Sequence, residues 1–170
     1  MKRFLLLGLL LTGSASYSVS AQGAFDVPAQ YSFSKPDDYA QVEPQVLNTI
    51  SWLEETPANQ DVSRRQQAQR FLLAWASGSP KVSIGLQPFV GELAGKNTAL
   101  LMAYMGGWTR YELQHPGDKD ALTLNTEGVK SMLKVYELGG IDKSPGMENL
   151  RTVAARGELE SWLRGKISMR

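Results

Sequence analysis

The sequence predicts an all-α fold of about five helices, packed as antiparallel helical hairpins. Apolar residues recur at three- and four-residue steps over most of the chain, which is the period of a helix. Proline, glycine and capping residues stand at the ends of these segments, where helices begin and end. Residues 80–96 depart from the pattern, and there the sequence predicts a short extended insertion, with one or two helical turns over residues 88–93 left open.

The first two predicted helices cover residues 43–55 and 61–77. Pro44 suits the first turn of the first helix, because a proline has no N–H and none is needed there. Asp61 is the expected N-cap of the second helix, and Gly78 is its stop signal. This second helix has one apolar face and an opposite face of arginines and glutamines.

Three further helices are predicted over residues 97–114, 118–138 and 144–164. The first of them is apolar all the way round, as suits a central helix that is contacted on several sides. Gly106 and Gly107 lie in its middle, where such residues allow another backbone to approach closely or mark a kink.

Some boundaries stay open at this point. Asp118 and Asp120 are alternative caps for the fourth helix, and Asn125 and Gly128 interrupt its apolar stripe. Two shorter helices are therefore the alternative in this region. Ser144, followed by a proline, is a good start signal for the last helix.

The amino terminus carries the features of a secretory signal peptide. Two cations precede a leucine-rich run, and Val19-Ser20-Ala21 offers the small residues that signal peptidase reads. The apolar run is far shorter than the roughly 20 residues that span a bilayer. We expect cleavage after Ala21, with cuts after Ser16 or Ser18 as alternatives, and hence a periplasmic or secreted protein.

The domain organisation follows from these features. Residues 1–21 are the expected signal peptide, 22–42 a lead-in segment, 43–165 a single helical domain and 166–170 a frayed tail. The chain has no cysteine, so neither a disulfide nor a lipidated cysteine is available, and stability must come from packing. No transmembrane segment is expected in the mature chain.

Two stretches carry a family resemblance. The segment Phe71–Val82 joins a helix end to its stop signal, and the segment Leu124–Glu137 is an amphipathic helix. Together they resemble a family of uncharacterised exported all-helical proteins of Bacteroidetes-type bacteria, over residues 40–165. The resemblance implies a helical fold and export, and it assigns neither an activity nor a catalytic residue.

Catalytic and metal-binding patterns are weak in this sequence. Glu112 and His115, the only histidine, form Glu-x-x-His, which is half of a di-iron site in a helical bundle. The other half would need a second histidine, so a helix-end histidine near the terminal carbonyls is the favoured interpretation. Adjacent carboxylates such as Glu54 and Glu55 point apart on a helix and do not form a glycosidase pair, so solvated helix faces are the favoured interpretation for them. No catalytic residue, metal or cofactor is predicted.

A surface for a partner is the more promising hypothesis. Exposed aromatic rings and a cationic helix face are the residue types that such a surface uses. The candidate residues are Trp52, Trp162, Tyr111, Arg64, Arg65 and Arg70. Ordinary core packing of the rings and a solvated helix face are the alternatives.

The sequence therefore favours a non-enzymatic protein-binding or structural module whose partner is an envelope or extracellular protein. Nucleic acid is not expected, because no basic block stands out and loss of Lys2 and Arg3 shifts the formal net charge from +1 to −1. One alternative is an envelope hydrolase whose groups, His115 among them, meet only in three dimensions. The other is a small-ligand carrier with an apolar cavity beside Gly106 and Gly107.

Overall fold

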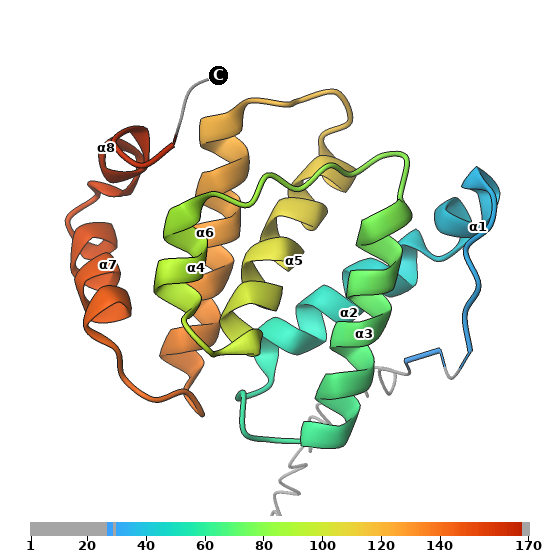
Figure 1. The fold of residues 1–170 in the computed structure, drawn as a ribbon, viewed down its shortest axis with the longest axis horizontal. Coiled ribbons are helices and arrows are strands. Elements are labelled where there is room, and N and C mark those ends of the chain that lie inside the picture. Colours follow the sequence, from blue (N-terminus) through green and yellow to red (C-terminus); the bar gives the residue numbers. More distant parts are fainter. Residues whose placement is uncertain (1–26, 29, 168–170) are drawn as a thin grey trace, which may run out of the picture.

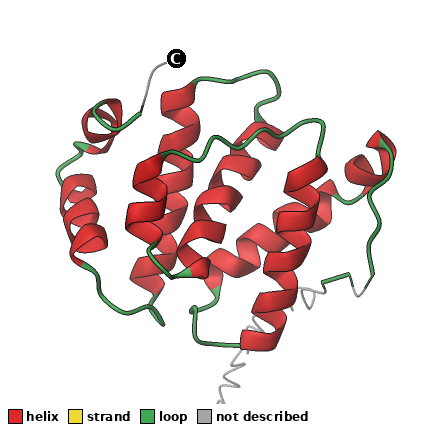
Figure 2. Ribbon diagram, in the orientation of Figure 1, coloured by secondary structure: helices red, strands yellow, loops and turns green. Residues whose placement is uncertain are grey.

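The computed structural model describes residues 27–28 and 30–167, and every regular element in that part of the chain is a helix (Figures 1 and 2). The predicted all-α class is thus confirmed, while the predicted signal peptide lies outside the described residues. The helices are α1 (Pro36–Gln41), α2 (Glu43–Glu55), α3 (Val62–Gly78), α4 (Pro88–Ala94), α5 (Thr98–Gln114), α6 (Ala121–Leu138), α7 (Pro145–Ala155) and α8 (Leu159–Arg164).

The antiparallel pair α5–α6 forms the centre of the fold (Figure 1). These two helices make the most extensive contact among the described helices, and α5 also contacts α2, α3 and α4. Asn97 caps α5 by accepting hydrogen bonds from the backbone N–H groups of Ala99 and Leu100. Asp120, rather than Asp118, caps α6 through the N–H of Thr123. The prediction of a central helix contacted on several sides is confirmed.

Glycines let α5 and its neighbours approach closely. A Cβ added at Gly107 would lie 2.7 Å from the Cβ of Ser131 on α6, and still closer to the carbonyl oxygen of Glu127. A Cβ added at Gly128 of α6 would lie 2.6 Å from the ring of Tyr104 on α5. Such distances do not occur between real side-chain atoms, so both positions require glycine. Gly128 therefore does not interrupt α6. It lets the ring of Tyr104 pack against the helix, and α6 continues as one helix through this position.

The helix count differs from the prediction of about five in three places. Residues 36–41 of the lead-in segment form α1, and residues 88–94 of the predicted extended insertion form α4, which begins at Pro88. The last predicted helix is divided into α7 and α8 by Gly157, whose φ of +73° lies in the left-handed region.

The lead-in segment is anchored by its aromatic residues. Phe33 stacks on Tyr39 with 4.9 Å between ring centroids, and Tyr31 meets Phe71 of α3 edge-on at 5.3 Å. The indole N–H of Trp75 donates to the backbone carbonyl of Tyr39 over 3.0 Å. The rings of the segment therefore pack against α3, which explains how a short helix such as α1 is held in place.

Hairpin packing is correct for α5–α6 but not for α2 and α3. Helix α2 runs crosswise to α5 and α6 and contacts both of them as well as α3 (Figure 1). Ile50 of α2 fits this crossing, because its Cγ2 lies 3.2 Å from the place where a Cβ of Gly106 would be. The space beside the paired glycines is therefore filled by α2 and α6, and it does not form the carrier cavity that the sequence left open.

The segment between α3 and α4 crosses over α5 without regular structure (Figure 1). The hydroxyl of Tyr104 lies 3.1 Å from the carbonyl oxygen of Gly85, and the N–H of Ser83 donates to Glu112 over 2.9 Å. These bonds fix the extended part of the insertion to α5. None of the described helices has the length and apolarity that a membrane crossing needs.

The close approach at Gly107 is testable by substitution. We expect Gly107→Leu to lower the free energy of unfolding by about 1–3 kcal/mol, because no leucine rotamer avoids the α6 backbone. Urea denaturation followed by circular dichroism measures the change. An unchanged midpoint would show that α6 does not pack against this residue.

Gly91→Ala is the matched control, since an added Cβ on this exposed residue of α4 meets no described atom within 4 Å. Alanine is the better helix former, so stability should stay constant or rise by up to about 1 kcal/mol.

Candidate functional site

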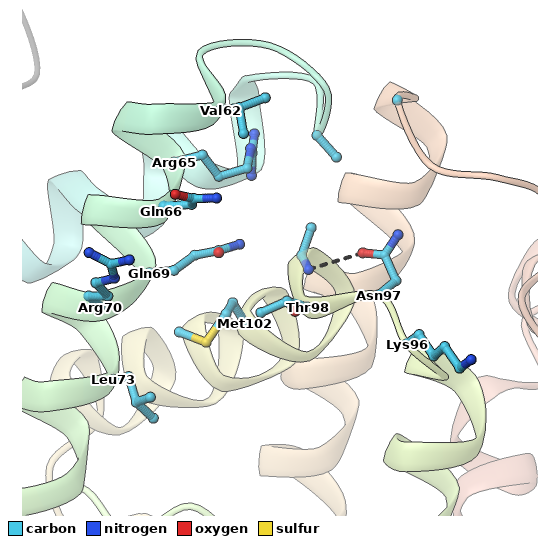
Figure 3. A pocket seen from close by; sticks show the side chains of 13 residues that line it. Val62, Arg65, Gln66, Gln69, Arg70, Leu73, Lys96, Asn97, Thr98 and Met102 are labelled. Atoms are coloured by element: carbon cyan, nitrogen blue, oxygen red, sulfur yellow. Dashed lines mark hydrogen bonds between the residues drawn. The ribbon is translucent and has the colours of Figure 1, made fainter.

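A groove lies between α3 and the start of α5 (Figure 3). Its volume is about 570 Å³, and it is open to solvent. Helix α3 forms one wall, the α4–α5 turn forms the other, and α5 lies between them. The lining residues are Ala58, Val62, Arg65, Gln66, Gln69, Arg70, Leu73, Lys96, Asn97, Thr98, Ala99, Met102 and Gly140.

The periodicity of α3 places this wall. Its apolar residues Ala68, Phe71, Leu72 and Trp75 are fully buried in the core, so the opposite side of the helix must face solvent. Asp61 holds the N-cap position as predicted, although its side chain makes no capping hydrogen bond.

Exposed apolar side chains lie on the α3 wall. Val62 and Leu73 are 53% and 47% exposed, because they lie on the side of α3 that faces away from its buried residues. Met102 of α5, which is buried, lines the groove between the walls (Figure 3). The groove therefore combines open apolar surface with polar side chains.

The charge of the groove lining is positive. Arg70 on α3 and Lys96 on the α4–α5 turn lie on opposite sides (Figure 3), and neither side chain forms an ion pair or hydrogen bond with a described residue. No lining residue is an aspartate or a glutamate. The first turn of α5 adds the partial positive charge of a helix N-terminus.

Arg65 has a structural role that its place in a polar helix face does not suggest. It is 5% exposed and donates to the carbonyls of Leu53, Thr56 and Pro57, with 3.3 Å to Leu53 and 3.2 Å to Pro57. These carbonyls belong to the end of α2, whose negative dipole favours a cation. The guanidinium lies 5.6 Å from the ring centroid of Trp52, and burial lowers the pKa of Arg65.

The other candidate residues do not gather on one surface. Arg64 is exposed on α3 outside the groove lining. Trp162 meets Phe89 edge-on at 5.5 Å and borders a separate hollow of about 370 Å³. The Tyr111 hydroxyl donates to Asp118 over 2.7 Å, and this bond raises the pKa of the tyrosine. Of the six predicted residues, the groove brings together Arg65 and Arg70, with Trp52 behind Arg65.

Glu112 and His115, which form the Glu-x-x-His pattern, have different partners in the structure. Glu112 is buried and accepts from Lys119 over 2.6 Å in addition to Ser83. His115 is exposed, stacks on Tyr111 with 4.1 Å between centroids, and places Nδ1 3.1 Å from the carbonyl oxygen of that residue. The favoured interpretation of a helix-end histidine is confirmed. Within the described residues no cluster of potential ligands is suited to a metal ion.

A buried carboxylate joins three helices on another side of α5. Glu54 of α2 is 2% exposed and accepts from Arg110 over 2.6 Å, from Lys134 over 3.3 Å and from Ser131. Burial alone would raise the pKa of Glu54, but the two hydrogen bonds and the two cations outweigh it, so the pKa lies below its ordinary 4.5. The sequence interpretation of Glu54 as part of a solvated helix face is therefore wrong, because the partners that make its burial favourable come from distant parts of the chain.

Comparison with known proteins yields no match to a protein-family model, to a curated protein or to a solved structure. The resemblance to exported helical proteins of Bacteroidetes-type bacteria stays a prediction. The candidate site is therefore identified by its geometry and charge alone. These add Lys96 to the candidate residues, although sequence reasoning did not identify it. The signal for it was available, since a lysine directly before the helix cap Asn97 adds its charge to a helix N-terminus.

The Glu54 network predicts a pH-dependent contribution to stability. Because the folded-state pKa lies below 4.5, the contribution is complete above that pH and is lost as the pH falls through the folded-state pKa. We expect Glu54→Gln to cost about 1–3 kcal/mol near neutral pH, less than a fully buried pair because Arg110 and Lys134 reach solvent. Urea titrations across the acidic range measure both effects.

The exposed neighbour Glu55 supplies the control for this prediction. Glu55→Gln should leave the pH profile of the wild type intact. A Glu54→Gln profile that keeps the same acid-induced loss would assign that loss to other groups.

Arg65 and Arg70 should respond differently to substitution. Arg65→Lys removes the planar fork that reaches several carbonyls, and we expect a loss of about 1–2 kcal/mol in unfolding free energy. Arg70→Ala should stay within about 0.5 kcal/mol of the wild type, since this side chain has no described partner. Thermal melting of both variants checks the contrast, and equal melting temperatures would argue against the capping role of Arg65.

Proposed function

We propose that this chain is an exported, non-enzymatic protein-binding module that holds its partner in the groove between α3 and α5. One observation carries the proposal: the groove exposes apolar side chains and cations that have no described partner within the chain. Val62, Leu73, Arg70 and Lys96 all line this groove, and neither charged side chain pairs with a described residue. Such exposed apolar surface, rimmed by polar residues, is characteristic of interaction sites.

The distribution of exposed apolar residues supports the choice of this surface. The large apolar side chains that stay exposed in the described chain are Tyr31, Val62, Leu73, Leu86 and Leu138. Two of these five line the same groove, and scattered single residues of this kind would need no explanation. The presence of two exposed apolar side chains in one lining distinguishes the groove from the rest of the described surface.

Binding fits the groove better than catalysis does. A hydrolytic site needs a nucleophile within reach of a base, and that base in turn needs an orienting group. Thr98 offers a hydroxyl in the groove, but the lining has neither a histidine nor a carboxylate. Extracytoplasmic location is part of the proposal and depends on the signal-peptide features of residues 1–21.

Site-specific photo-crosslinking in cells that export the full chain tests this function. A photo-reactive phenylalanine analogue at Gln69, which points into the groove (Figure 3), should yield a discrete adduct with another protein. The analogue at Gln67, which is exposed on the same helix outside the lining, is the control and should not. Identical adducts from both positions, or none from Gln69, would remove the support for this groove.

A further inference from the structure

We infer that the groove selects an acidic amphipathic segment of its partner, in which an apolar side chain is flanked by carboxylates. The apolar side chain would contact Leu73 and Met102, and the carboxylates would pair with Arg70 and Lys96. The inference rests on the proposed function and adds the chemistry of the partner to it.

The cations of the groove are distinguished by their shared position in one lining, since other exposed cations of the described chain, such as Arg64 and Arg156, also form no ion pair. Ion pairs occupy Lys81, Lys119, Lys130, Lys134, Arg110 and Arg151. Arg70 and Lys96 have no such pair with a described carboxylate, and Arg65 behind them is held by backbone carbonyls and the Trp52 ring. Three cations thus border one hollow without a compensating anion in its lining, which favours an anionic occupant.

Acidic side chains near the groove mark its limits. Glu92 and Asp142 line a neighbouring hollow of about 530 Å³, which shares Lys96 and Asn97 with the groove. Asp61 stands at the cap position before Val62. The neighbouring hollow therefore has a mixed lining, in which Lys96 and Lys143 face two acids, whereas the charged residues in the lining of the groove are cations only.

The size and lining of the groove point to a peptide segment rather than a small anion. About 570 Å³ exceeds the space that one phosphate or carboxylate fills, and Arg70 and Lys96 stand on opposite sides (Figure 3). Apolar surface between two cations matches an apolar residue between two acids. Gln66 and Gln69 add amide groups that can pair with a peptide backbone. Nucleic acid would require a longer basic stripe.

Selection from a random peptide display library against the purified protein tests the inference without knowledge of the natural partner. We expect the selected peptides to be enriched in aspartate and glutamate on both sides of an aliphatic or aromatic residue. The same selection on the Arg70→Glu/Lys96→Glu double variant should lose this enrichment. Neutral or basic consensus peptides, or selection that is equal on both proteins, would overturn the inference.

Fluorescence anisotropy of the best selected peptide gives the quantitative test. Replacement of its acids by the corresponding amides, or use of the double variant, should weaken binding about tenfold or more, and added salt should weaken the acidic peptide alone. Arg64→Glu is the matched control, because this exposed arginine lies on α3 outside the lining, and it should bind normally. Arg64→Glu and the double variant should melt like the wild type.

The outcomes separate the two proposals. Retained affinity after the acids are replaced by amides overturns the acidic selectivity, while a specific adduct from Gln69 would still support a protein-binding groove. Loss of that adduct overturns the proposed function itself. Vesicles of phosphatidylglycerol supply a further probe: binding to them that depends on Arg70 and Lys96 and displaces the peptide would assign the groove to lipid and overturn the inference.

Discussion

The close contact between α5 and α6 determines where every other helix can lie. Gly107 admits the α6 backbone at Glu127, and Gly128 admits the ring of Tyr104 from the opposite side. With this pair fixed, α2 crosses beside Gly106, while α3 and α4 pack against the remaining sides of α5. The start of α5 is then held beside α3, and the groove between them follows from the central contact.

Charged residues divide into two groups that serve different ends. Inside the fold, the buried carboxylates Glu54 and Glu112 bind cations from α5, α6 and the loop between them, and so join segments distant in sequence. At the groove, Arg70 and Lys96 have no described counterpart. The buried carboxylates are thus neutralised within the fold, whereas the positive lining of the groove has no acid of its own and forms the electrostatic basis of the proposed binding site.

Sequence reasoning succeeded where the signal is local. The bounds of α2, the cap Asn97 and the close packing at Gly107 follow from helix period, capping chemistry and the absence of a side chain, while the choice between Asp118 and Asp120 needed the structure. Sequence reasoning failed where the environment of a residue is set by a partner that is distant in the chain. Arg65 reads as a solvated residue of a polar face, and only the end of α2 makes its burial favourable. The division of the last helix at Gly157 is different, because its signal is local: glycine is the usual left-handed residue after a helix end, and the prediction of one continuous helix overlooked it.

The separation of the groove surface from the core has a consequence for the history of such a chain. Leu73, Arg70 and Lys96 are exposed, whereas the cohesion of the helices comes from the α5–α6 contact and the buried carboxylates. Substitutions at these exposed positions cost the fold little. The proposed binding specificity is therefore free to change over evolution while the scaffold is kept, and among the cations of the groove only the buried Arg65 is tied to the fold.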